Sequence, residues 1–182
     1  MREVLISIHQ NWCELILSGD KTAEIRKSVP GELSPPFKCY IYCTKVGAKE
    51  DSPATPGKVI GHFICDHIYP IRVFENGTIQ DWNWHNMKNT CVPYDDIATY
   101  IGNNKRGWGW QISNLKVYDE PKDLSEFRAI CNGDITGKCT NCEYAYAENT
   151  EGGRYEECLC NMILPVKRPP QSWMYVYTET LE

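Results

Sequence analysis

A run of ionisable and hydroxyl side chains near the N-terminus has the residue types that bind or transform a polar ligand. A lysine ammonium is a point charge suited to a phosphate or a carbonyl, whereas an arginine offers a planar fork suited to a phosphate, a carboxylate or a base edge. A glutamate can accept a hydrogen bond from a base amino group, act as a general base, or neutralise the arginine. The run consists of Lys21, Thr22, Ala23, Glu24, Ile25, Arg26 and Lys27.

These residues form a strand in our interpretation, and successive side chains of a strand point to opposite faces. Thr22, Glu24 and Arg26 then share one face, and Ala23 and Ile25 share the other, which suits a core. Two interpretations of the polar face stay open. It lines a ligand-binding cleft, or it is a charged surface on which Glu24 and Arg26 only pair with each other, since exposed ion pairs are common and weak.

The elements around this run are short. A strand is predicted at residues 4–8, followed by a helix that Asn11 caps with Glu14 as in a capping box, and Gly19 suits the position just past the helix end. Short strands with few helices predict an α+β fold, a small mixed β-barrel with short flanking helices. Further strands are predicted at 38–44, 59–68, 108–117 and 173–177, and helical segments at 94–101 and 123–127.

Length and composition limit the class of protein. The 182 residues, 42% hydrophobic and with six tryptophans, predict a single domain over residues 1–182. A net charge of −5 argues against a protein that coats nucleic acid non-specifically, but it allows a local basic cleft. We find no apolar run long enough to cross a bilayer and no secretory signal, so we expect a cytoplasmic protein without a membrane partner.

The ten cysteines fall into two groups. Those scattered among apolar residues are expected to be small buried hydrophobes: Cys13, Cys39, Cys43, Cys65 and Cys91. The others crowd into one polar stretch and include the two close pairs Cys139/Cys142 and Cys158/Cys160, with Cys131 as a possible substitute. Four thiolates suit a tetrahedral structural zinc, which would order this stretch and leave no open position for catalysis. The alternative is free or disulfide-linked thiols in a loop.

Several segments together resemble one family, the ASCH domain. Residues 17–26, with the sequence Leu-Ser-Gly-Asp-Lys-Thr-Ala-Glu-Ile-Arg, resemble its opening motif after Ser7-Ile8. The Val-Ile-Gly-His-Phe run that begins at Val59 resembles its next signature. Residues 110–113 and 169–176 resemble the closing strands of a bacterial and phage-type branch. The resemblance spans nearly the whole chain, with residues 128–160 as a cysteine-rich insertion.

The resemblance implies a PUA-like β-barrel whose cleft binds RNA or a nucleotide, including modified nucleotides. It implies Lys21, Glu24 and Arg26 as cleft residues. Second-tier candidates that the fold can bring nearby are Ser7, His9, Trp110, Gln171 and Ser172, although Trp110 also suits the core. An aromatic side chain there would stack on an unpaired base.

Two other functions stay open. Some family members are amidohydrolases that deacylate an acetylated cytidine with a lysine and a threonine of this run. Here Glu24 holds the position of that threonine and Thr22 stands two residues earlier, so a hydrolase would use Lys21 with Thr22 or Glu24. Other family members sit in transcription coactivator assemblies, and the insertion 128–160 would then dock a protein partner.

Three aromatic residues form a further candidate surface. Trp82, Trp84 and His85 suit a lid or a base-stacking surface, and they suit a peripheral packing cluster equally well. His62 and His67, in or beside a predicted strand, are expected to be structural.

Overall fold

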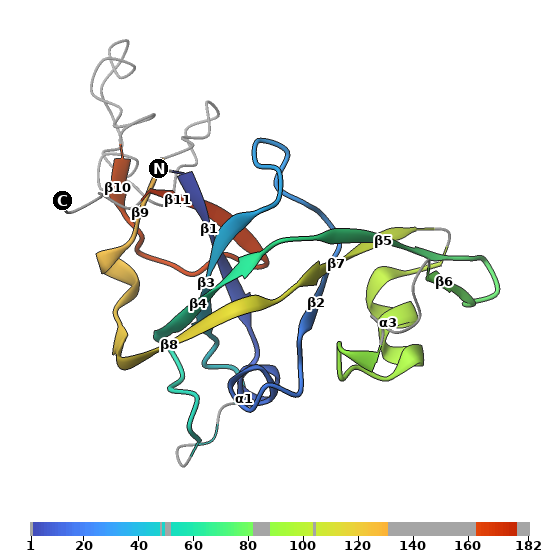
Figure 1. The fold of residues 1–182 in the computed structure, drawn as a ribbon, viewed down its shortest axis with the longest axis horizontal. Coiled ribbons are helices and arrows are strands. Elements are labelled where there is room, and N and C mark those ends of the chain that lie inside the picture. The colour runs from blue at the N-terminus through green and yellow to red at the C-terminus, as the bar shows by residue number, and fades with distance from the viewer. Residues whose placement is uncertain are drawn as a thin grey trace, which may run out of the picture.

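The structure is a computed structural model that describes residues 2–47, 49, 52–81, 88–103, 105–130 and 163–177. Within these residues the fold has two sheets and two α-helices (Figure 1). The larger sheet has the strand order β10-β9-β11-β1-β3-β4-β8, and the smaller has the order β2-β7-β5-β6.

The elements are, in chain order, β1 (Arg2–Ile8), α1 (Gln10–Leu17), β2 (Ala23–Arg26), β3 (Phe37–Cys43), β4 (Val59–Cys65), β5 (Ile68–Val73), β6 (Ile79–Asp81), α3 (Tyr94–Ile101), β7 (Arg106–Gln111), β8 (Ser113–Lys122), the 3-10 turn η1 (Leu124–Glu126), β9 (Arg128–Ile130), β10 (Ile163–Pro165) and β11 (Trp173–Tyr177).

Strands β1 and β3 form the centre of the larger sheet and are covered on both faces. They pair in parallel, and such pairs are usually buried on both sides. Val4, Ile6 and Ile8 join one hydrophobic cluster, with Cys13 and Ile16 of α1, whereas Leu5 joins a cluster on the opposite face. The predicted alternation along 38–44 is confirmed in the same way, because Cys39, Ile41 and Cys43 face the first cluster, and Tyr40 and Tyr42 face the second.

The smaller sheet carries the charged run and α3. Its core holds Ala23 and Ile25 of β2 with Ile97 and Ile101 of α3. The predicted division of the β2 side chains is therefore confirmed, with Ala23 and Ile25 on the apolar side. The helix predicted at 94–101 is confirmed as α3, and the short helix before Gly19 as α1; Gly19 has φ +84 at its end.

The α+β class predicted from the sequence is confirmed, but the predicted small β-barrel does not close. Within the described residues the strands form two sheets that the continuous run of β7 and β8 connects, as the long yellow strands of Figure 1 show. The chain changes sheet at Ile112, which divides the strand predicted at 108–117: β7 pairs with β2 and β5, and β8 pairs with β4. The start of β2 is hydrogen-bonded to a loop, because Thr22 and Ala23 donate their backbone N–H groups to the Asn89 carbonyl.

Three local predictions also need correction. The helix α1 begins after His9, which makes no side-chain capping hydrogen bond, so the capping box at Asn11 is wrong. The strand predicted at 59–68 ends at Cys65, and β5 starts at Ile68. Of the scattered cysteines, Cys13, Cys39, Cys43 and Cys65 are buried as predicted, but Cys91 is half-buried.

The C-terminal region forms one edge of the larger sheet. Arg128–Ile130, at the start of the predicted insertion, forms β9 and pairs with β10 and β11. Residues 131–162 lie outside the described residues, as do Trp82, Trp84 and His85. In the described part of the chain, no helix has both the length and the apolar character needed to cross a bilayer.

The close approach of β4 to β8 depends on Gly61. A methyl group at this position would collide with the Lys116 carbonyl oxygen of β8. We expect Gly61→Ala to lower the free energy of unfolding by about 1–3 kcal/mol, as overpacking does. Urea denaturation measures this loss. Gly31→Ala is the matched control, because a methyl group there meets open space. Equal stability of the two variants would contradict the prediction.

Candidate ligand-binding cleft

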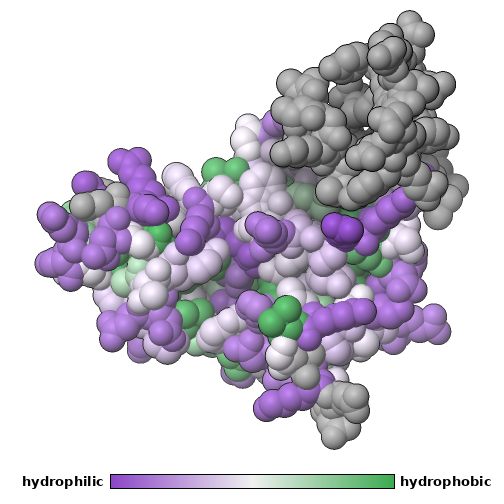
Figure 2. Space-filling view, turned by 180° about the vertical axis from the view of Figure 1, so that it is seen from behind, coloured by the Kyte–Doolittle hydropathy of each residue, from purple (hydrophilic) through white to green (hydrophobic). Residues whose placement is uncertain are grey.

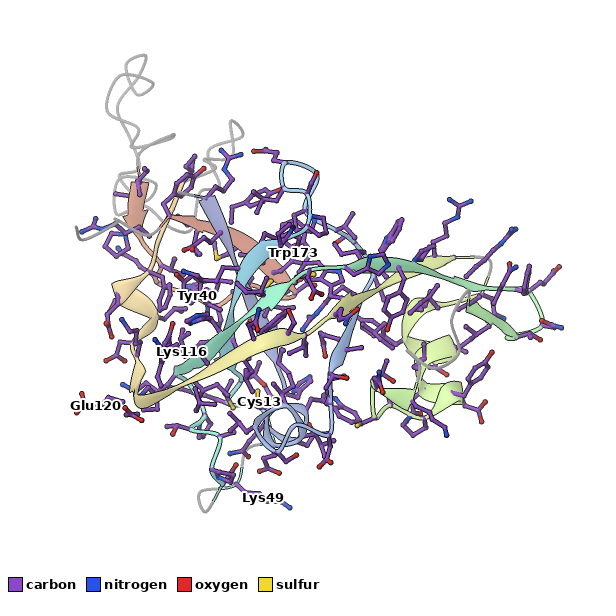
Figure 3. The ribbon with its side chains drawn as sticks, viewed as in Figure 1. Cys13, Tyr40, Lys49, Lys116, Glu120 and Trp173 are labelled. Carbon is purple, nitrogen blue, oxygen red and sulfur yellow. The ribbon has the colours of Figure 1, made fainter. Side chains whose placement is uncertain are left out.

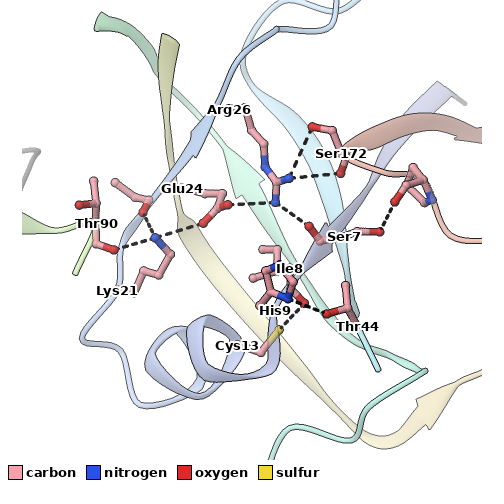
Figure 4. Close-up of polar contacts among 12 residues, drawn as sticks. Ser7, Ile8, His9, Cys13, Lys21, Glu24, Arg26, Thr44, Thr90 and Ser172 are labelled. Atoms are coloured by element: carbon pink, nitrogen blue, oxygen red, sulfur yellow. Dashed lines mark hydrogen bonds and ion pairs between the residues drawn. The ribbon is translucent and has the colours of Figure 1, made fainter. Parts of the chain in front are cut away.

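A cleft of about 1120 Å³ lies where the two sheets approach each other. Residues of β1, α1, β2, β3 and α3 line it, together with the segment 166–171 before β11. Lys21, Glu24 and Arg26 lie side by side in its wall and contact one another (Figure 4). We refer to these three residues as the ionic chain.

Lys21 begins the ionic chain and is only 1% exposed. Its Nζ donates to the Ala23 carbonyl at 2.8 Å and to the Thr90 carbonyl at 2.7 Å, and it lies 3.1 Å from Glu24 Oε2. An ammonium has three protons, so these three acceptors use all of them. Lys21 therefore holds β2 and the segment before α3 together, and a ligand would have to displace one of its partners to contact it.

Glu24 and Arg26 continue the chain towards the larger sheet. Glu24 Oε1 lies 2.9 Å from Arg26 Nη2, which also donates to the Ser7 carbonyl of β1 at 2.7 Å. Arg26 Nη1 makes longer contacts, 3.4 Å to the Ser172 carbonyl and 3.5 Å to Ser172 Oγ. The buried Nε of Arg26 has no hydrogen-bond partner among the described residues. Arg26 thus has N–H donors whose hydrogen bonds are long or absent, and Glu24 can accept further hydrogen bonds.

The ionic chain has a net charge of +1, because two cations flank one carboxylate. All three side chains are at most 10% exposed, so they are largely removed from water. Buried ions are tolerated when each is paired and hydrogen-bonded, which is the case here. The site therefore presents fixed donors and a carboxylate acceptor, and the carboxylates of Asp96 and Asp123 also line the cleft. This arrangement suits a ligand with paired polar edges or a small number of anionic groups.

The structure brings together most of the candidate residues named from the sequence. Ser7, His9 and Gln171 line the cleft with the ionic chain. Ser7 Oγ donates to the Pro170 carbonyl at 2.7 Å, and His9 Nδ1 lies 3.2 Å from Thr44 Oγ1. Ser172 contacts Arg26 but is not among the lining residues.

Two candidates lie elsewhere. Trp110 is fully buried in the larger hydrophobic core, with its ring edge-on to Phe37 at 5.7 Å, so its placement in the cleft is wrong and its core position is confirmed. Thr22 is not among the lining residues; its backbone bonds to Asn89 and Ile112 hold it beside β2. The cysteines of the predicted zinc site, Cys131, Cys139, Cys142, Cys158 and Cys160, lie outside the described residues.

The sequence analysis missed the aromatic walls of the cleft. Trp12, Tyr42 and Tyr100 line it. Tyr42 is buried, and burial, followed by the nearby Cys43, raises the pKa of its hydroxyl. Tyr100 is 41% exposed; burial also raises its pKa, while Arg26 lowers it and Glu24 raises it. Tyr42 belongs to a predicted strand and Tyr100 to a predicted helix, but sequence spacing alone could not place either beside the ionic chain.

Comparison with known proteins identifies the fold. No family model and no curated protein sequence matches the chain. Among solved structures, the ASCH protein of Zymomonas mobilis matches with 20% identity and a TM-score of 0.50, over 67% of this chain and 73% of that one. The chain has an ASCH fold. A tyrosine-to-phenylalanine variant of the same Zymomonas protein matches over 76% of its length, and a serine-to-alanine variant over 74%, with the same identity and TM-score.

The resemblance stated from the sequence is therefore confirmed at the level of the fold. In this ASCH fold the opening motif forms the end of α1 and β2, and its three charged residues become the ionic chain.

Lys21 is expected to support the fold as well as the cleft. Lys21→Met would leave the Thr90 and Ala23 carbonyls without their buried donor and remove one of the two cations beside Glu24. We expect a loss of about 3–5 kcal/mol in the free energy of unfolding, typical of a buried ion pair that loses one partner. Urea denaturation of Lys21→Met measures it.

The control is Lys116→Met, which changes an exposed lysine on β8 (Figure 3). This variant should stay within about 0.5 kcal/mol of wild type. A Lys21→Met variant as stable as the control would mean that the three contacts of Lys21 contribute little to folding.

Proposed function

We propose that this chain binds single-stranded RNA, or a nucleotide from it, in the cleft over the ionic chain. The observation that carries the proposal is the ionic chain itself: a net positive set of buried donors with a carboxylate acceptor, in a cleft with aromatic walls. The ASCH fold, PUA-like in character, supports the same class of ligand.

The donors and acceptors suit a nucleotide. Glu24 would accept a hydrogen bond from a base amino group, because its two oxygens hold more lone pairs than Lys21 and Arg26 use. Arg26 would donate to a base acceptor or a phosphate through Nη1, whose contacts to Ser172 are long. Lys21 would act by its charge and by holding the wall in place.

The extent of the cleft suits an oligonucleotide. Its volume of about 1120 Å³ is near the upper end of the range typical of small-molecule pockets, about 300–1,000 Å³. It extends from α3 past the ionic chain to exposed Lys45 and Lys167. Figure 2 shows hydrophilic side chains over much of this face, with small, separate hydrophobic patches between them.

Hydrolysis receives less support from the same geometry. A lysine ammonium that donates to three acceptors has no free lone pair to act as a base. Both carboxylate oxygens of Glu24 already contact a cation, Oε2 with Lys21 at 3.1 Å and Oε1 with Arg26 at 2.9 Å. Thr22 is not among the residues that line the cleft.

Substitution of Arg26 tests the proposal. Arg26→Lys keeps the charge but loses the fork that reaches Glu24, Ser7 and Ser172 together. We expect its affinity for a short single-stranded RNA of about eight nucleotides, within known site sizes, to fall at least tenfold. Fluorescence anisotropy at two salt concentrations gives the affinity and the salt slope. A shallow slope is expected, because the small basic surface contacts few phosphates.

Arg72→Lys is the matched control, since Arg72 is exposed and lies over Phe74, outside the residues that line the cleft. Circular dichroism and thermal melting establish that both variants are folded at the temperature of the assay. If a folded Arg26→Lys variant bound RNA like wild type, or if wild type bound no RNA, the proposal would fail.

We also propose a structural zinc for the cysteine-rich stretch, on the sequence spacing alone. Purified protein should contain stoichiometric zinc by elemental analysis. The double variant Cys139→Ser/Cys142→Ser should lose the zinc. The variant Cys91→Ser should keep it; Cys91 is half-buried, and its thiol donates a hydrogen bond to the Asp20 carbonyl. Zinc-free wild type under reducing conditions would contradict this proposal.

A further inference from the structure

Tyr100 stands out among the aromatic residues of the cleft. It is 41% exposed, whereas Tyr42 is 6% exposed and Trp12 is half-buried beneath the Lys21 ammonium, 5.4 Å from its ring. An aromatic ring held open to water on a cleft wall has surface available to a flat partner. Tyr100 therefore offers the largest accessible fraction among the aromatic residues that line the cleft.

The helix that carries Tyr100 is firmly placed. Ile97 and Ile101 of α3 are buried in the smaller core, one turn before Tyr100 and directly after it. The lack of a side chain at Gly107 leaves room for Ile101, since a methyl group there would lie 2.5 Å from Ile101 Cδ1. Lys21 holds the segment that leads into α3 through the Thr90 carbonyl. The ring is thus presented on a rigid element.

A cation covers part of the Tyr100 ring. Lys27 Nζ, from the residue just after β2, lies 4.8 Å from the ring centroid. A cation at this distance is attracted by the ring electrons, typically by about 0.5–1 kcal/mol at an exposed site. This contact restrains the side chain and occupies one face of the ring. With Lys27 on one face, a base that stacks on Tyr100 would have to use the opposite face.

Tyr100 also lies close to the ionic chain. Arg26 and Glu24 both act on the pKa of its hydroxyl, and all three residues line the same cleft. A flat group stacked on the ring would share the cleft with a donor, Arg26, and an acceptor, Glu24. Nucleobases have this combination of an aromatic face and a polar edge.

We propose that Tyr100 is the stacking residue of this site. Its ring receives one unpaired nucleobase on the face opposite Lys27, and the edge of that base meets Glu24 and Arg26. This inference rests on the proposed RNA binding and adds the part of the ligand that is recognised. Stacking tolerates every base, so the contact selects for an unpaired base rather than for one sequence.

The test compares two substitutions at Tyr100. Tyr100→Leu keeps an apolar side chain but removes the ring, and its affinity for the eight-nucleotide RNA should fall roughly five- to 150-fold, the range expected for one stacked base. Tyr100→Phe keeps the ring and should stay within about threefold of wild type. Phe74→Leu is the matched control, since Phe74 is an exposed ring with Arg72 over it at 5.0 Å but does not line the cleft.

A second probe separates stacking from a purely structural role. This probe is a strand of the same length whose sugars carry no bases. Wild type should bind it more weakly than RNA, and Tyr100→Leu should bind it as well as wild type does. Equal losses of affinity for both strands in Tyr100→Leu would overturn the stacking role, as would unchanged RNA affinity in that variant.

The failures are distinguishable. If Arg26→Lys loses RNA binding while Tyr100→Leu keeps it, the proposed function stands and the stacking inference is wrong. If wild type binds neither strand, both proposals are wrong. If Tyr100→Leu and Phe74→Leu lose equal RNA affinity, the effect is not specific to the cleft and the inference is wrong.

Discussion

The rest of the site depends on the buried ionic chain, because it connects the two halves of the fold. At one end Lys21 reaches the Thr90 carbonyl, in the segment that leads into α3 of the smaller sheet. At the other end Arg26 reaches the Ser7 carbonyl of β1, in the middle of the larger sheet. Glu24 connects the two cations. The walls of the cleft belong to these two halves, so the contacts that support the fold also fix the geometry of the cleft.

Such a chain needs an explanation beyond stability. Removing charges from water is costly, and apolar residues of similar volume often stabilise a buried site as well or better. Two cations flank one carboxylate, so the ionic chain carries a net charge of +1. Binding of an electronegative group, as proposed above, would account for charges at this position. Arg26 Nη1 makes only long contacts, and the Nε of the same side chain is buried without a hydrogen-bond partner among the described residues.

The sequence predicted the local features of the site but not its connections. Alternation along the strand placed Glu24 and Arg26 opposite Ala23 and Ile25, and helix signals placed α3, because both depend on neighbouring residues. Trp110 was ambiguous, since strand alternation assigns a face but does not say what covers it. The two open sheets depend on the change of sheet at Ile112 and on the Asn89 loop at the edge of β2. The partners of Lys21 and Arg26 lie up to 146 residues away in sequence, beyond any periodic pattern.

On the proposed function, the same long-range contacts would give the cleft two kinds of recognition. The charges of the ionic chain would act on phosphates and polar edges, and salt would screen the part of this attraction that reaches solvent. The ring of Tyr100 would act on the face of a base, where salt has little effect. Because Lys21 holds the segment before α3 and Lys27 lies over Tyr100, both kinds of contact are positioned from the charged run of residues 21–27. One short segment thus sets the charge of the cleft and the placement of its aromatic wall, which explains why hydroxyl, acidic and basic residues are so dense there.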